Sequence, residues 1–262
     1  MNVSVNGCQI HYSTGGREPK ADEPVILLIH GAGMDSTVWQ LQTRWLAFKG
    51  YRVIALDLPG HGRSKGKILR NIASMADWVA SFLNAVGISG CTVVGHSMGG
   101  LVGLEFVSRY PGYVRSIGLL GVSTRMVVHP DLLKAAKKNK KIASALICDW
   151  GYSARLHIGG NPTIGAWAIE GGRRIIERAS PGVLASDLLA CDSYKDAEKA
   201  ARNISCKTLF LLGRDDKMVS KKQLEPLSEA IKGSKVLVLE EAGHMMMFEA
   251  PVLTNKALLR IV

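Results

Sequence analysis

Short apolar runs alternate with helix-like stretches along most of this chain, and this alternation constrains the fold more than any other feature. The runs occupy residues 25–29, 52–56, 91–94, 116–120, 207–212 and 235–239. The helix-like stretches occupy residues 37–49, 71–86, 98–110, 221–232 and 245–260. The run 25–29 contains no polar residue, which is typical of a strand buried on both faces, and the other runs are similar. The alternation therefore predicts an α/β fold, with a mostly parallel twisted sheet and helices on both faces.

The amino-terminal segment has a different pattern. Two β-rich runs, residues 3–5 and 8–12, are joined by Asn6 and Gly7. Asn-Gly favours a two-residue type I′ turn, because both positions require a positive φ. We therefore expect a hairpin at the start of the chain.

One interval breaks the alternation. About 85 residues with helical character and frequent glycines separate the run that ends near Leu120 from the run that begins at Lys207. We interpret residues 123–204 as a helical insertion after the sixth strand, and residues 1–122 with 205–262 as the core of one structural domain. Ligands of open α/β sheets bind at the carboxyl ends of the strands, so this insertion is expected to form a cap over a site there.

Composition restricts the class of protein. The chain has 262 residues, of which 47% are hydrophobic and 21% are charged, as in ordinary globular proteins. A membrane-spanning helix needs about 20 apolar residues, whereas the longest apolar run, Val25–Ile29, is far shorter. The first residues carry no basic segment followed by a long apolar stretch, so we expect no secretory signal and a cytoplasmic protein.

The charge is unusually basic, since 33 Lys and Arg residues against 22 Asp and Glu residues give a net charge of +11. The basic residues that cluster within the insertion are Lys134, Lys137, Lys138, Lys140, Lys141, Arg173, Arg174 and Arg178. No helix-turn-helix, zinc-finger or aromatic RNA-binding motif accompanies them, so we expect no nucleic-acid partner. We interpret the cluster as a solvated helix face; attraction of an anionic ligand or surface is the alternative.

The five cysteines contain no C-x-x-C pair. Their odd number and scattered positions argue against structural disulfides and against a zinc site. We expect Cys8, Cys91, Cys148, Cys191 and Cys206 to be small, mostly buried side chains in a reducing compartment.

The segment Gly95-His96-Ser97-Met98-Gly99-Gly100 lies directly between a predicted strand and a predicted helix. This is the G-x-S-x-G pattern in its strand-turn-helix context, in which a strained turn exposes a nucleophilic serine. Side chains two residues before or after the serine would collide, which accounts for Gly95 and Gly99. We therefore predict that Ser97 is a nucleophile and that the Met98 amide, at a helix amino terminus, stabilises an oxyanion.

A second oxyanion donor is expected from the loop His30-Gly31-Ala32-Gly33, which follows the run 25–29. Glycines on both sides allow this loop to bend toward the serine, so we select the Ala32 amide. The alternative is a plain strand-to-helix turn.

Ser97 requires a base, and seven histidines compete for that role. We select His244, because it follows the late run 235–239 on a loop that can reach over the carboxyl edge of the sheet. The other six histidines lie in turns, in the hairpin or in the insertion; they are His11, His30, His61, His96, His129 and His157.

The acid that orients the base is expected after the run 207–212, where Gly213-Arg214-Asp215-Asp216 follows. The geometry of the sequence alone does not separate Asp215 from Asp216. The corresponding position after the preceding strand, residues 121–123, contains no carboxylate, which strengthens this assignment. The resulting order of serine, aspartate and histidine is that of α/β-hydrolases.

The chain resembles the α/β-hydrolase superfamily over nearly its whole length, and in particular the serine-nucleophile branch of esterases, lactonases and monoacylglycerol-lipase-like enzymes. The matching motifs are HGAG at 30–33, DLPGHGRS at 57–64, GHSMGG at 95–100, GRDD at 213–216 and AGH at 242–244. The family pattern G-x-x-D implies that the acid is Asp216, and the family's oxyanion donors correspond to Ala32 and Met98. The family usually has proline where Val219 or Ser220 stands, a departure that affects a turn.

This resemblance implies an enzyme that cleaves a carboxylic ester or a lactone through a Ser97–His244–Asp216 triad and an acyl-enzyme. No metal or organic cofactor is implied. Haloalkane dehalogenases and epoxide hydrolases of the superfamily have aspartate at the nucleophile position, so Ser97 excludes them. The alternatives are a cofactor-free perhydrolase or haloperoxidase, a hydroxynitrile lyase, a carbon–carbon hydrolase, and a slow-turnover ligand receptor.

The insertion contains several large apolar residues, including Met126, Leu146, Trp150 and Trp167. They suit an apolar acyl or ring group, although packing explains such residues more often. The run 245–248 after His244 either faces the pocket or begins a buried helix. The identity and chain length of the substrate and the oligomeric state stay open.

Overall fold

The strands form a single sheet in the computed structural model, which describes residues 1–20, 22–138, 140–163 and 165–262. Their bounds are β1 (Asn2–Val5), β2 (Cys8–Ser13), β3 (Val25–Ile29), β4 (Arg52–Leu56), β5 (Cys91–His96), β6 (Val114–Leu120), β7 (Lys207–Gly213) and β8 (Lys235–Leu239). Within the described residues the sheet has eight strands in the order β1-β2-β4-β3-β5-β6-β7-β8. The strands predicted from the apolar runs are thus confirmed, with small shifts at their ends.

The direction of the strands divides the sheet in two. From β4 to β8 all neighbours are parallel, whereas β1 pairs antiparallel with β2 and β2 antiparallel with β4. The β1–β2 turn places Asn6 at φ 50° and Gly7 at φ 77°, the two positive values that a type I′ turn requires. The predicted hairpin and the mostly parallel sheet are confirmed.

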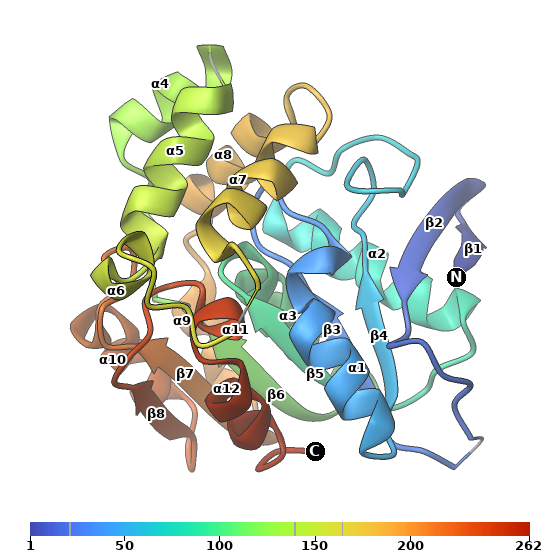
Figure 1. The fold of residues 1–262 in the computed structure, drawn as a ribbon. Coiled ribbons are helices and arrows are strands. Elements are labelled where there is room, and N and C mark those ends of the chain that lie inside the picture. The colour runs from blue at the N-terminus through green and yellow to red at the C-terminus, as the bar shows by residue number, and fades with distance from the viewer. Residues whose placement is uncertain (21, 139, 164) are drawn as a thin grey trace.

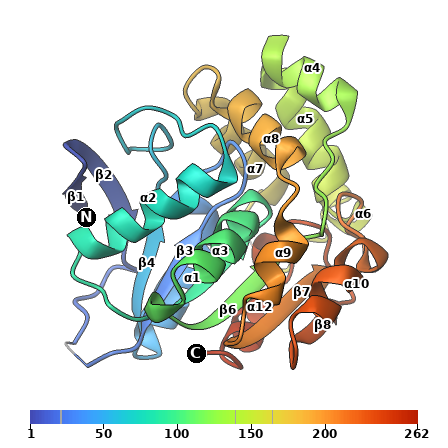
Figure 2. The same ribbon diagram turned by 180° about the vertical axis from the view of Figure 1, so that it is seen from behind.

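Helices cover both faces of the sheet (Figures 1 and 2). On one face lie α1 (Gln40–Phe48), which follows the 3₁₀ turn η1 (Ser36–Trp39), and α12 (Pro251–Leu258). On the other lie α2 (Ile72–Ala85), α3 (Met98–Arg109) and α10 (Lys221–Ala230). Two apolar cores result, because successive strand residues point to opposite faces: Leu27 packs in one core and Leu28 in the other.

The segment between β6 and β7 is helical, as expected. Its helices are α4 (Pro130–Lys138), α5 (Lys140–Gly151), α6 (Ala154–His157), α7 (Ala168–Arg178), α8 (Val183–Ser193) and α9 (Ala197–Arg202). Figure 1 shows α4, α5, α7 and α8 grouped beyond one end of the sheet. The last helix, α9, instead contacts α3 and α10 on the face of the sheet.

The sequence predicts one helical stretch at residues 245–260, but the structure has two helices there, α11 (Met246–Glu249) and α12. Ala250 lies between them with φ −137° and ψ 57°. The ring of Pro251 disfavours the helical conformation for the residue before it, while proline itself is well suited to the first position of a helix. The prediction of a continuous helix was wrong because it overlooked this effect.

All five cysteines are free thiols, three of them buried. Burial raises the thiol pKa of Cys91 and of Cys148 to about 12, so both are protonated at neutral pH. None of the helices in the described ranges is long and apolar enough to cross a membrane.

Candidate active site

Ser97 occupies a strained position between β5 and α3. Its backbone has φ 53° and ψ −120°, a conformation that residues with a Cβ atom rarely adopt. The Ser97 N–H group donates a hydrogen bond of 2.8 Å to the Leu120 carbonyl at the end of β6. This bond anchors the turn to the neighbouring strand, and it means that the Ser97 amide is not available as an oxyanion donor.

The glycines around Ser97 are required by close backbone packing. A Cβ on Gly95 would lie 2.1 Å from the Gly99 carbonyl oxygen, and one on Gly99 would lie 2.3 Å from the Ile29 carbonyl oxygen. A Cβ on Gly100 would lie 2.2 Å from the Val122 side chain. The predicted crowding around the serine is therefore present, and it also presses α3 against the end of β3.

His244 and Asp216 form a buried pair. The distance from His244 Nδ1 to Asp216 Oδ2 is 2.8 Å, and the two side chains are 3% and 0% exposed. The other oxygen, Oδ1, accepts the N–H groups of Met218 and Val219, each at 2.8 Å. An ionised carboxylate accepts hydrogen bonds at both oxygens, so the matching tautomer of His244 carries its proton on Nδ1 and leaves Nε2 without one.

Asp215 lies outside this arrangement. Its side chain is exposed, and its backbone N–H donates to the Ala242 carbonyl at 2.9 Å. The structure thus brings Asp216, and not its neighbour, to the histidine.

His96 contacts the loop that carries His244. Its Nε2 lies 3.0 Å from the His244 carbonyl oxygen and donates to it, while the two rings lie 4.7 Å apart. Burial, together with the neighbouring His244, holds the pKa of His96 well below its ordinary value. His96 is therefore neutral, and it fixes the backbone of His244 without adding a charge to the site.

Glu249 holds the same loop from the other side. Its fully buried carboxylate accepts the N–H groups of Gly243 at 3.0 Å and Met245 at 3.1 Å, the residues that flank His244. It also accepts the N–H group of Ser153 at 2.8 Å, from the segment between β6 and β7. Burial raises the pKa of this carboxyl group, although the three N–H donors oppose the shift.

The loop after β3 supplies the second predicted donor. Met34 N–H bonds the Gly31 carbonyl at 3.2 Å, which closes a turn around Ala32 and Gly33, and Gly33 has φ 67°. Among the described residues, no hydrogen bond engages the N–H group of Ala32 or that of Met98. Ala32 is partly exposed and lines a cavity beside Ser97, whereas Met98 is buried and does not line that cavity.

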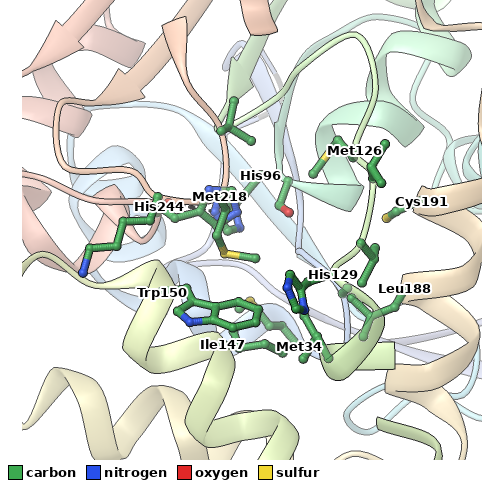
Figure 3. Close-up of a pocket in the computed structure, with 17 residues that line it drawn as sticks. Met34, His96, Met126, His129, Ile147, Trp150, Leu188, Cys191, Met218 and His244 are labelled. Carbon is green, nitrogen blue, oxygen red and sulfur yellow. Dashed lines mark hydrogen bonds between the residues drawn. The ribbon is translucent and has the colours of Figure 1, made fainter. Parts of the chain in front are cut away.

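A cavity of about 410 Å³ lies beside Ser97 (Figure 3). Ser97, His96 and His244 line it, as does Ala32. Most of its remaining wall is apolar, and Figure 3 shows Met34, Met126, Ile147, Trp150, Leu188 and Met218 around the space. An apolar wall of this kind strengthens electrostatic interactions within the cavity and suits an apolar substrate group.

The predicted apolar residues divide between the cavity and other surroundings. Met126 and Trp150 line the cavity, Leu146 packs against a core, and Trp167 is 76% exposed. The residues of the run 245–248 are buried in a core and do not line the cavity. Of the two alternatives for this run, the structure favours the buried helix.

Several residues of the site lack a local signal in the sequence. His129 lines the cavity, and its ring lies 5.4 Å from that of Trp150. Glu249 carries no motif of its own, and its role becomes visible only when Ser153, 96 residues away in the chain, lies beside it.

The comparisons with known proteins agree with this architecture. The model of the alpha/beta hydrolase family matches residues 26–257. The chain belongs to the alpha/beta hydrolase family. The resemblance drawn from the motifs is therefore confirmed, and the protein is a hydrolase of this family.

Named relatives of this alpha/beta hydrolase differ in substrate. It is 24% identical to an (E)-2-((N-methylformamido)methylene)succinate hydrolase of Acinetobacter baylyi, over 98% of this chain and 95% of that protein. It is 27% identical to a putative carbamate hydrolase of Variovorax paradoxus, over 95% of this chain and 94% of that protein. The crystal structure of the enol-lactonase from Burkholderia xenovorans LB400 superposes with a TM-score of 0.87 at 22% identity, over 100% and 99%, which shows the shared fold.

Proposed function

We propose that this alpha/beta hydrolase is a serine hydrolase that cleaves carboxylic esters, lactones included. Ser97 is the nucleophile, His244 the general base and Asp216 the residue that orients it. The observation that carries this proposal is that a strained serine and an aspartate-bound histidine line one apolar cavity. Groups in this relation activate a hydroxyl that is otherwise a weak nucleophile.

In the acylation step, the Ser97 hydroxyl oxygen attacks the carbonyl carbon while Nε2 of His244 accepts the hydroxyl proton. The carbonyl oxygen becomes an oxyanion, which accepts hydrogen bonds from the amides of Ala32 and Met98. Asp216 holds the Nδ1 proton of the resulting imidazolium. Collapse of the tetrahedral intermediate breaks the carbon–oxygen bond, and His244 gives its proton to the leaving alkoxide.

In the deacylation step, a water molecule attacks the acyl-enzyme, and His244 accepts a proton from it. The second tetrahedral intermediate collapses to release the carboxylic acid and to return the proton to Ser97. With a lactone, the leaving alcohol stays attached to the acyl group, so the product is a hydroxy acid.

The cavity wall favours an apolar acyl or ring group on the substrate. We propose that residues 123–204 act as a cap, because α4, α5 and α8 contribute Leu132, Ile147 and Leu188 to the wall. One named relative is a putative carbamate hydrolase. A carbamate presents the same kind of carbonyl to the oxyanion donors, so it belongs in the substrate panel.

A substrate panel with wild-type protein and Ser97→Ala tests the proposal. The panel contains p-nitrophenyl acetate, butyrate and octanoate, a γ-lactone, a δ-lactone and an aryl carbamate. We expect ester or lactone turnover that Ser97→Ala lowers by at least about a thousandfold, since triad members act as a unit. Equal turnover by wild type and Ser97→Ala, or turnover confined to the carbamate, would contradict an ester hydrolase.

A further inference from the structure

A second histidine–aspartate pair lies outside the proposed triad. His61, in the loop after β4, places Nε2 at 2.8 Å from Asp187 Oδ2 on α8. The two side chains are 1% and 0% exposed. The pair thus joins the segment 123–204 to the core across a fully buried contact, between residues 126 positions apart.

The surroundings of the His61 ring define its protonation. Nδ1 lies 3.1 Å from the carbonyl oxygen of Pro59, and Nε2 faces the Asp187 carboxylate. A carbonyl oxygen and a carboxylate only accept hydrogen bonds, so both ring nitrogens must donate. A histidine with two donating nitrogens is an imidazolium, and its charge compensates the buried carboxylate.

The neighbouring His30 has the opposite pattern. Its Nε2 accepts the N–H group of Leu58 at 3.2 Å, and its Nδ1 donates to the Gly31 carbonyl at 2.9 Å. The two imidazole rings lie 4.9 Å apart. Because Nε2 of His30 must be unprotonated, this ring is neutral, and burial followed by the charge of His61 lowers the pKa of His30.

Other charged groups around His61 are already engaged. Asp57, after β4, accepts the N–H groups of Ser36 at 2.7 Å and Arg63 at 2.8 Å. Asp35, which acts on His30, is bound by Arg178 of α7 at 2.6 Å. Burial alone would lower the pKa of His61, but Asp187, with smaller contributions from the Pro59 carbonyl and Asp57, raises that pKa. Asp187 is therefore the main partner of the imidazolium.

The same carboxylate oxygen holds the oxyanion loop. Asp187 Oδ2 accepts the N–H group of Gly33 at 2.8 Å. That N–H belongs to the peptide that follows Ala32, so the bond fixes the plane of this peptide within the turn. Leu184, one turn earlier on α8, also packs on Gly33, since a Cβ there would lie 2.7 Å from Leu184 Cδ1.

We propose that Asp187 and the His61 imidazolium are a positioning pair that holds the Ala32 oxyanion donor in its reactive orientation, through the Gly33 amide. This inference rests on the proposed function, because it assigns Ala32 the role of oxyanion donor. The pair touches neither substrate nor nucleophile. It acts on the transition state through the loop alone.

Loss of the His61 proton would disrupt this arrangement. Asp187 Oδ1 is buried and has no hydrogen-bond partner among the described residues. Without the imidazolium the carboxylate would keep a buried negative charge that no cation compensates, which is unfavourable in an apolar interior. Since the pKa of His61 is raised, the positioning is complete below the ordinary histidine pKa and is lost as the pH rises through the raised pKa.

The kinetic test compares wild type, Asp187→Asn and Asp187→Ala between pH 6 and 10 on an ester from the panel. The asparagine amide oxygen can still accept from Gly33 and from a neutral His61, without a charge. We expect Asp187→Asn to keep kcat within about tenfold at pH 7, the equivalent of one lost hydrogen bond, and to lack the alkaline decline of wild type. Asp187→Ala should lower kcat at pH 7 by about 10- to 100-fold with little change in KM, because an oxyanion donor acts in the transition state.

Asp149→Asn is the matched control, since it removes an exposed carboxylate from α5. It should behave as wild type at every pH. Superimposable pH profiles of kcat for wild type and Asp187→Asn would overturn the proposal. Wild-type kcat in a folded Asp187→Ala protein would overturn it as well.

A spectroscopic test needs neither a variant nor a substrate. In ¹⁵N NMR spectra of the wild-type protein at pH 7, both ring nitrogens of His61 should be protonated. The Gly33 amide resonance should shift in the same alkaline transition in which His61 loses its proton. An unprotonated His61 nitrogen at pH 7, or a Gly33 amide resonance that does not follow the titration of His61, would overturn the proposed positioning role of the pair.

These measurements separate the two claims. Turnover that survives in Ser97→Ala would remove the proposed function, while the NMR titration would still report whether Asp187 couples His61 to Gly33. Turnover lost in Ser97→Ala and retained in full by Asp187→Ala would remove only the positioning pair.

Discussion

The two oxygens of Asp216 have different partners, and this division determines what the residue can do. Oδ1 is held by two backbone N–H groups, so Oδ2 points in a fixed direction at His244. A carboxylate placed in this way selects the tautomer of the imidazole and stabilises its charged form. The exposed Asp215 has neither the backbone contacts nor the direction.

We predict that Asp216→Asn lowers kcat by about 10³- to 10⁴-fold, because the amide can force the wrong tautomer on the histidine. Asp215→Asn should change kcat by less than about twofold, since a solvated carboxylate contributes little. Steady-state kinetics of the two variants on one ester provides the check. The reverse ranking would move the acid by one residue.

The residue types of the candidate triad and their order along the chain could be predicted from the sequence. Asp215 and Asp216 were equivalent candidates until the resemblance to a family favoured Asp216. The physical reason is that the choice depends on the turn made by Met218 and Val219, whose amides bind only one of the two side chains. Such a turn is not visible in the spacing of the motif.

At the scale of elements, the backbones at the β5–α3 junction pack closely against each other and against β3. Gly99 allows the first turn of α3 to touch the backbone at the end of β3, where the oxyanion loop begins. One substitution there acts on the serine turn and on the Ala32 loop at once.

We predict that Gly99→Ala destabilises the protein by about 1–3 kcal/mol, the usual cost of overpacking, and lowers kcat by more than tenfold. Gly171→Ala, in α7, is the matched control, because a Cβ there meets no atom within 4 Å. It should be neutral or stabilising by up to about 1 kcal/mol through helix propensity. Thermal unfolding and kinetics of both variants test this, and equal stabilities would show that the close approach is not required.

The strands were predictable because each is a short apolar run with a clear boundary, and the turn at Asn6 and Gly7 carries a local signal. The break before Pro251 was also within reach of the sequence, since proline restricts the residue before it. The contact of α8 with the loop after β4 could not be predicted from the sequence. His61 and Asp187 are distant in the chain, and only packing of the helical segment onto the core brings them together.

At the scale of the whole molecule, the basic charge is less concentrated than the sequence suggests. Arg173 and Arg174 pair with glutamates of their own helix, and Arg178 pairs with Asp35. The exposed lysines of α4 lie on the helix whose other face contributes Leu132 to the cavity. The side chain of Lys140 lies outside the described part of the chain. Lys217 also lines the cavity, so an anionic substrate would meet a positive field there.

We predict that kcat/KM for an ester with a carboxylate group falls several-fold between 10 and 500 mM NaCl, because salt screens exposed charges. The value for a neutral ester of the same size should stay constant, which makes it the internal control. Replacement of Lys134, Lys137 and Lys138 by alanine should reduce the salt dependence. An equal response of both esters would leave the lysines as a solubilising surface only.

If Ser97 is the nucleophile of a serine hydrolase, a reagent that reacts with activated serines should form a covalent adduct at this residue. The protein is treated with phenylmethylsulfonyl fluoride, digested, and mapped by peptide mass spectrometry while residual esterase activity is followed. We predict one sulfonyl group per chain on Ser97, activity lost in proportion to labelling, and no labelling in His244→Ala. A label on another residue, or a fully labelled protein that still hydrolyses the ester at its original rate, would contradict it.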